Sequence, residues 1–211
     1  MRLAGTGALI ATAQLPLFGD ETPAAAIPTR HSSPRLFLSY GVVELGLEEP
    51  FSLLHISDSH LTEAYDDESE KDLKWKAKRS QLFGQEQEAA LIYELEWAKQ
   101  HVEFIVHTGD IIDWQDRANL DLMEKYLGRD FIGCVGNHEY KVSTEKYQRT
   151  EEYKSLGYNR LRKYFPKGVL FASQVVHGVN FITMDNVFGY VTEDQIWKFE
   201  AEVKKRLPIV L

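Results

Sequence analysis

Three short apolar runs, each followed by polar residues, constrain the fold of this chain more than any other feature. They occupy residues 51–57, 103–108 and 131–135, and segments with helical periodicity separate them. Strands that alternate with helices form neighbouring parallel strands joined by right-handed crossovers. The sequence therefore predicts an α/β fold, with a layered β-sheet core flanked by helices.

The polar residues that follow these runs should gather at one edge of the sheet, because the carboxyl ends of parallel strands lie at the same edge. In such sheets, ligands bind at this edge. The residues concerned are Asp58, His60, Asp110, Asp113, Asn137 and His138. If the backbone stays extended after the first run, Asp58 and His60 also point the same way, because strand side chains alternate between faces. Carboxylate, imidazole and amide ligands together suit divalent ions such as Mn, Fe or Zn.

In this order, the motifs Asp-x-His, Gly-Asp-x-x-Asp and Gly-Asn-His-Glu resemble those of the calcineurin-like metallophosphoesterase family, over residues 51–211. The resemblance implies that Asp58 and His60 bind one metal ion. It also implies that Asp110 bridges two ions and that Asn137 binds the second through its amide oxygen. Two ions about 3.5 to 4 Å apart can activate a water for phosphoester hydrolysis without a covalent intermediate.

The family resemblance gives His138 a different role from that of its neighbour Asn137. It implies that His138 contacts the phosphate and protonates the leaving oxygen, a task suited to a group that titrates near neutrality. Two interpretations of Asp113 are open. Its carboxylate orients His138, or it caps the turn or helix that begins at Trp114.

Related subgroups and partner classes can be compared with the same residues. Purple acid phosphatases need a tyrosine near the second motif, where this chain has Asp113 and Trp114, and protein Ser/Thr phosphatases need glycine and arginine patterns that it lacks. With 24 basic and 32 acidic residues the net charge is −8, which disfavours nucleic acid as a partner. A phosphorylated small-molecule or lipid substrate is expected, with metal ions supplying the local positive charge.

Other segments give local predictions. Residues 35–45 and 51–57 are expected to form a hairpin, and the acidic segment 63–74 is expected to be a solvated loop. A helix is predicted over residues 86–100. Its inward face should comprise Ala89, Ile92, Leu95 and Ala98.

The last third is expected to supply scaffold. Residues 168–176 and 179–186 are predicted to be strands around a turn at His177, which is interpreted as a turn residue and not as a metal ligand. A helix follows from Thr192, where Gln195 completes a capping box. Its core-facing stripe should be Ile196, Phe199 and Val203.

The two ends of the chain carry further expectations. Residues 1–34 resemble a secretory signal with a linker, so export to the periplasm or outside the cell is expected; the alternative is a disordered cytoplasmic tail. The apolar run is too short for a transmembrane anchor. Residues 35–211 should form the metallophosphoesterase domain.

The family's later metal-binding histidines, and the second half of its sheet, have no counterpart before Leu211. The domain is therefore expected to be carboxy-terminally incomplete, and the 211-residue chain is expected to hydrolyse phosphoesters poorly alone. The alternative function is that of a non-catalytic remnant or binding module that retains part of the fold.

Overall fold

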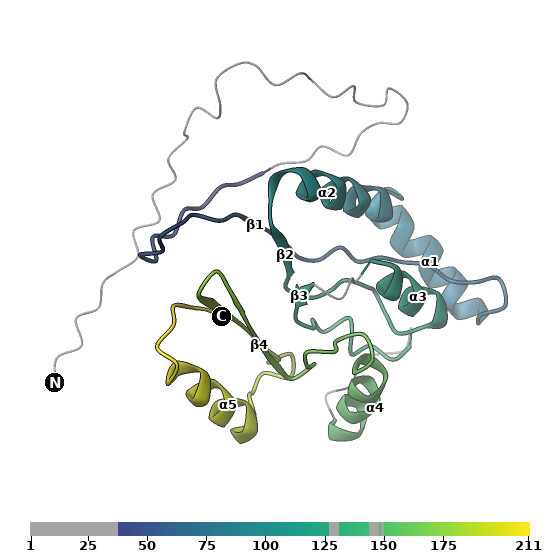
Figure 1. Cartoon of the computed structure of the whole chain (residues 1–211). Coiled ribbons are helices and arrows are strands. Elements are labelled where there is room, and N and C mark those ends of the chain that lie inside the picture. Colours follow the sequence, from purple (N-terminus) through teal and green to yellow (C-terminus); the bar gives the residue numbers. More distant parts are fainter. Residues whose placement is uncertain (1–37, 127–130, 144–147, 149) are drawn as a thin grey trace, which may run out of the picture.

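The computed structural model describes residues 38–126, 131–143, 148 and 150–211. The expected signal-like segment and linker, residues 1–34, lie outside the described residues. Figure 1 shows the elements, which in chain order are β1 (Leu53–Ile56), α1 (Glu70–Leu82), α2 (Gln87–His101), β2 (Phe104–His107), α3 (Arg117–Tyr126), β3 (Ile132–Gly133), α4 (Glu151–Leu161), β4 (Phe171–Val176), β5 (Val179–Met184), α5 (Glu193–Val203) and β6 (Ile209–Val210).

The three apolar runs form a parallel sheet in the order β1-β2-β3. Leu53 lies opposite Phe104, and Val106 lies opposite Ile132, so the carboxyl ends of all three strands reach the same edge. Helices connect β1 to β2 and β2 to β3. This arrangement confirms the predicted α/β fold with a parallel sheet.

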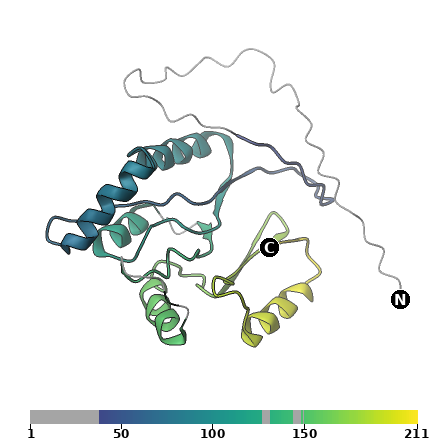
Figure 2. The same ribbon diagram turned by 180° about the vertical axis from the view of Figure 1, so that it is seen from behind.

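A second sheet, in the order β4-β5-β6, follows the first in the chain. β4 and β5 are antiparallel around the predicted turn at His177, and β6 runs parallel to β5. In Figures 1 and 2 this sheet and α5 lie apart from the group formed by α1, α2 and α3. β3 of the first sheet lies next to β5 of the second.

The layers follow from the alternation of side chains along β1 and β2. Leu54 and Ile105 point into the larger core cluster, which contains Leu91 of α2 and Met123 of α3. The alternate residues point the other way, into a smaller cluster with β5. These residues are Leu53, Phe104 and Val106, and they pack with Val179 and Phe181. The first sheet is therefore covered by helices on one face and by the second sheet on the other.

The predicted hairpin with residues 35–45 is wrong in its described part. Residues 38–47 form no strand, and β1 pairs with β2 instead. Val42 and Val43 are exposed, whereas Leu45 and Leu47 pack against the smaller core cluster. Packing of these two leucines thus holds residues 45–47 against the core, although the segment forms no strand.

The predictions for α1 and α2 are partly wrong. The acidic segment 63–74 is a loop only as far as Ser69, because α1 begins at Glu70. The hydroxyl of Ser69 caps the helix by accepting a hydrogen bond from the backbone N–H of Asp72. The helix predicted over residues 86–100 is confirmed as α2. Ala98 is buried and Leu95 packs against the larger core cluster, as predicted, whereas Ala89 and Ile92 are exposed and Leu91 is buried instead.

The helix predicted from Thr192 is confirmed as α5, with both hydrogen bonds of the capping box formed. Its predicted stripe is wrong at Ile196 and Val203, which are exposed. The buried residue is Gln195, whose side-chain amide donates to the carbonyl oxygen of Leu170. Among the described residues, no helix is both long and apolar enough to cross a membrane.

Candidate metal centre

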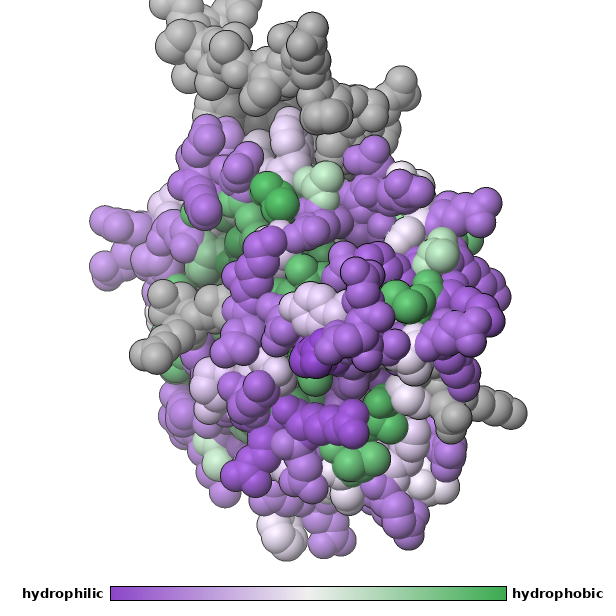
Figure 3. Space-filling view, turned by 90° about the vertical axis from the view of Figure 1, so that its right-hand side faces the viewer, coloured by the Kyte–Doolittle hydropathy of each residue, from purple (hydrophilic) through white to green (hydrophobic). Residues whose placement is uncertain are grey.

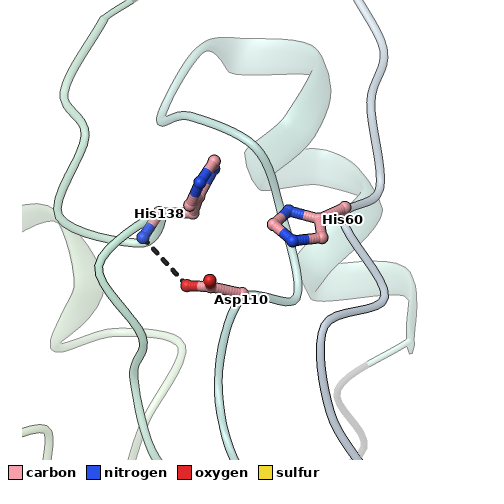
Figure 4. Close-up of side chains that lie close together, drawn as sticks. All are labelled: His60, Asp110 and His138. Atoms are coloured by element: carbon pink, nitrogen blue, oxygen red, sulfur yellow. Dashed lines mark hydrogen bonds between the residues drawn. The ribbon is translucent and has the colours of Figure 1, made fainter. Parts of the chain in front are cut away.

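Three chemically suitable side chains converge beyond the carboxyl ends of the parallel strands. Figure 4 shows His60, Asp110 and His138 around one space, each from the loop that follows a different strand. Each offers a ligand atom, and these atoms lie within 4.8 Å of one another. Two imidazoles and a carboxylate are a donor set that fits a transition-metal ion. His60 and Asp110 are predicted metal ligands, whereas His138 was expected to act on the phosphate and not to bind metal.

The backbone reaches this arrangement by turning and not by staying extended. Asp58, His60 and Asp110 all have positive φ angles, of 57°, 44° and 55°. The condition of an extended chain after the first strand is therefore not met. The backbone N–H of Asp58 donates to the carbonyl oxygen of Gly109, and that of His60 donates to Asp110, so the first loop is aligned along the second. Asp58 Oδ1 nevertheless lies 3.6 Å from His60 Nε2.

Two glycines let the loops after β2 and β3 approach closely. A Cβ atom on Gly109 would lie 2.5 Å from the backbone nitrogen of Gly136, and a Cβ atom on Gly136 would lie 2.1 Å from Asp110 Oδ1. Gly109 also has a φ of 104°, which side chains disfavour. The contact brings the backbone N–H of His138 to Asp110 Oδ1 at 3.0 Å, the dashed line in Figure 4.

Glu139 joins these two loops and was given no role by the sequence. Its side chain is fully buried, and its oxygens accept four backbone hydrogen bonds. The donors are Asp110, Ile111 and Ile112 after β2, and Gly136 after β3. Burial and the charge of Asp110 raise the pKa of Glu139, whereas these donors oppose that rise. One carboxylate therefore takes the place of strand pairing beyond the ends of β2 and β3.

Asp113 is the second buried carboxylate of the site, with 1% of its side chain exposed. Its Oδ1 lies 3.0 Å from Nδ1 of His60 and 3.2 Å from Nδ1 of His138. Burial raises the pKa of Asp113, but hydrogen bonds from both histidines and from Arg79 hold it well below its usual range. The capping role belongs to Asp116, whose Oδ1 accepts from the backbone N–H of Asn119 at 2.7 Å. The geometry thus favours the orienting interpretation of Asp113.

The contacts of Asp113 also define the tautomers of the two histidines. Nδ1 of His138 lies 3.0 Å from the carbonyl oxygen of Asp113, which can only accept, so Nδ1 carries the proton. Nδ1 of His60 likewise faces a carboxylate. Both rings therefore keep Nε2 for a metal or a substrate. Burial lowers the pKa of His138, but Asp113 and Asp110 outweigh it and raise the pKa above its usual value.

Helix α1 adds two residues that the sequence did not indicate. Arg79 donates to Asp113 through Nε, at 2.8 Å, and through Nη2. Phe83, just after the helix, stacks on the ring of His60 with centroids 5.3 Å apart. The sequence signal was the start of the helix, where Ser69 and Asp72 are spaced as a cap; nothing in the sequence connects Arg79 with Asp113.

The remaining predicted residues lie at the periphery or elsewhere. Asp58 and Asn137 are exposed, Asp58 beside His60 and Asn137 in the loop between Gly136 and His138. His177 bonds to Glu103, which precedes β2, at the opposite end of that strand from Asp110. It is therefore not part of the metal centre, as expected.

Comparison with known proteins agrees with the order of these motifs. The model of the calcineurin-like phosphoesterase family matches residues 51–211, which contain all three strand-end loops. No curated protein matches the chain significantly. The family match spans most of the chain and includes the site described above. The chain belongs to the calcineurin-like phosphoesterase family.

Proposed function

We propose that this protein hydrolyses a phosphoester with the help of two divalent metal ions, which are Mn, Fe or Zn. Asp58, His60, Asp110 and Asn137 would hold them. One observation carries the proposal: Asp113, itself buried, contacts Nδ1 of both His60 and His138 and so leaves both Nε2 atoms for the site beside Asp110. Family membership supports metal-dependent phosphoester hydrolysis.

The chemistry divides between the metal ions and the chain. Bound ions would lower the pKa of a water and neutralise charge on the phosphate. The side chains orient the catalytic groups and protonate the leaving oxygen. Asp113 fixes the ring of His138, and the raised pKa of this histidine keeps its proton available near neutral pH for the leaving oxygen. Arg79 and Thr62 donate to Asp113 and hold that carboxylate in place.

His138 has two possible roles in this mechanism. The proposal makes it the general acid. Its ring nitrogen also lies close enough to the ligand atoms of His60 and Asp110 to bind the same metal ion. The two roles have different consequences for metal content. Loss of a general acid lowers turnover and leaves the metal bound, whereas loss of a ligand releases the metal.

The test compares wild-type protein with His138→Ala, using hydrolysis of bis(p-nitrophenyl) phosphate and elemental analysis of bound metal. As a general acid, His138 should contribute roughly 10²- to 10⁴-fold to turnover with metal content retained. The matched control is His177→Ala, which removes a histidine outside the site and should leave both readouts unchanged. Wild-type protein that binds metal but hydrolyses neither this diester nor p-nitrophenyl phosphate would favour the non-catalytic binding module.

We also propose that the substrate is a phosphorylated small molecule or lipid and that the protein is exported. The composition of residues 1–34 supports export. Mass spectrometry of the protein from its native source should find a first residue beyond the apolar run. An intact Met1 in the soluble cytoplasmic fraction would contradict export.

A further inference from the structure

One face of α1 is directed at the metal centre and carries an ordered set of cations and aromatic rings. Lys71, Trp75, Arg79 and Phe83 recur at every fourth position, which places them on one side of the helix. At one end of this face, Arg79 bonds to Asp113 and Phe83 stacks on His60. The face therefore continues the wall of the site away from the two histidines.

Lys141 meets this face from the loop that carries the catalytic motif. Its backbone N–H donates to the carbonyl oxygen of His138, at 3.0 Å, so it lies one turn beyond that histidine. Its Nζ lies 4.6 Å from the centroid of the Trp75 ring, and Nζ of Lys78 lies 4.9 Å from the same ring. Two ammonium groups thus share one aromatic side chain beside the metal centre.

The ammonium group of Lys141 has no ion-pair partner among the described residues. The side chain is half-buried, and among the residues that the structure describes no carboxylate lies within ion-pairing distance of its Nζ. Burial lowers the pKa of Lys141, and Arg79 and Lys71 also lower it, whereas Asp113 raises it. An ammonium group has three donors, and contact with a ring satisfies none of them fully. This position therefore favours an anionic partner.

The surrounding surface indicates what kind of anion fits. In a protein with a net charge of −8, a group of cations next to a carboxylate-rich metal centre draws a negatively charged ligand to this place. Figure 3 faces the side of the molecule where α1 and α3 lie in Figure 1, and there hydrophilic side chains dominate with small separate apolar groups. A compact, highly charged substrate fits this surface better than a long acyl chain.

We propose that Lys141, held against Trp75 of α1, binds a second phosphate group of the substrate while the first lies at the metal centre. The inference rests on the proposed function and specifies it: the substrate class is a phosphoester that carries another phosphate. Lys141 would be a specificity-determining residue, and the α1 face would be the wall that holds it.

The test uses two probes that cannot be hydrolysed, methylphosphonate and methylenediphosphonate, which differ by one phosphonate group. Each is titrated by calorimetry into the full chain at the same Mn²⁺ concentration. Wild-type protein should bind the diphosphonate more tightly, and Lys141→Met should weaken that binding about tenfold or more while methylphosphonate binding stays unchanged. Lys141→Arg should retain most of the affinity for the diphosphonate.

The matched control is Lys163→Met, which removes a lysine that lies 4.3 Å from the ring centroid of Tyr164, in a similar cation–aromatic pair at the end of α4. It should change neither titration. Equal weakening of both probes by Lys141→Met, an unchanged diphosphonate affinity, or no wild-type preference for the diphosphonate would overturn the inference. Hydrolysis of neither bis(p-nitrophenyl) phosphate nor p-nitrophenyl phosphate, with the diphosphonate preference intact, would instead overturn only the proposed function.

Discussion

The two sheets of this protein are built in opposite ways. In the second sheet, β4 and β5 each have six residues and pair without interruption from Phe171 opposite Met184 to Val176 opposite Val179. In the first sheet, β1 and β2 have four residues and β3 has two. We call the first sheet with α1, α2, α3 and its loops the first unit, and the second sheet with α5 the second unit. Regular pairing accounts for the structure of the second sheet, whereas much of the first unit lies in loops beyond its strands.

Backbone and side-chain groups of these loops find partners in two buried carboxylates. Glu139 accepts from the loops after β2 and β3, and Asp113 accepts from both histidines of the site. Buried polar groups require such partners, because an unsatisfied one costs about 1 to 3 kcal/mol. The comparison teaches that the first unit gains its site by replacing strand pairing with a few side-chain acceptors. Its structure should therefore depend more strongly on single residues.

A pair of glycines gives the most severe test of this difference. Gly109→Ala should lower the free energy of unfolding by about 3 kcal/mol or more, because the new methyl group meets the backbone of Gly136 at 2.5 Å. Gly178→Ala, in the β4–β5 turn, introduces the same group at a φ of 79° with nothing within 4 Å, and should cost about 1 kcal/mol. Urea denaturation of both variants measures the difference. Equal costs would refute the contrast between the two units.

Replacement of Glu139 should lower both stability and metal affinity, whereas replacement of a buried polar residue in the second unit should lower stability alone. Glu139→Gln places an amide donor against backbone donors and should cost about 2 to 3 kcal/mol, with a large loss of Mn²⁺ affinity because the Asp110 loop is released. Gln195→Ala removes a buried polar side chain of the second unit, which bonds to Leu170 and Asp185. It should lower stability without changing Mn²⁺ affinity. Calorimetry that finds the same Mn²⁺ affinity in Glu139→Gln as in wild type would contradict the role given to this residue.

A third variant sharpens the comparison through pH. Burial raises the pKa of Asp116, at the start of α3, to about 7. A raised carboxyl pKa stabilises the fold at low pH, and this contribution is lost as pH rises from about 4 to about 7. Its size is on the order of 2 kcal/mol after allowance for partial exposure to solvent. Asp116→Asn, which keeps a side-chain acceptor for the cap, should flatten this part of the stability profile.

Thermal unfolding across this pH range, with Gln195→Ala as a destabilised control that loses no titratable group, measures the effect. If Asp116→Asn and wild type lose the same stability between these pH values, another group is responsible for the pH dependence.

The smallest expected effect concerns a contact that joins the two units. His177 Nε2 lies 2.5 Å from Glu103 Oε2, and the His177 ring stacks on Phe51. Both partners of this hydrogen bond are about half exposed, so a double-mutant cycle with His177→Ala and Glu103→Ala should give a coupling energy below about 1 kcal/mol. A much larger coupling would show that the units depend on each other more than their separate architectures indicate.

The sequence predicted what depends on local pattern. The strand ends that carry His60, Asp110 and His138 were recognisable because apolar runs stop at polar residues, and the capping box of α5 was recognisable from Thr192 and Gln195. The sequence pattern failed to predict which side chains are buried where a partner distant in the sequence determines their direction. Gln195 turns inward because backbone acceptors lie there, and this displaces Ile196 to the surface.

The same limit applies to the site. Arg79 precedes Asp113 by 34 residues, and the acceptor role of Glu139 appears only once the loops after β2 and β3 lie together. Neither contact has a periodic signature in the chain. The ring-to-ring packing of Phe83 on His60 is of the same kind.

The left-handed backbone at Asp58, His60 and Asp110 has a consequence for how such a protein can change over time. Glycine would adopt these angles with less strain, and each present residue costs on the order of 1 kcal/mol for its side chain. Glycine at these positions would relieve the backbone but remove the side chains that the proposed metal site uses. Stability of the fold and the proposed metal binding therefore make opposite demands on these three residues.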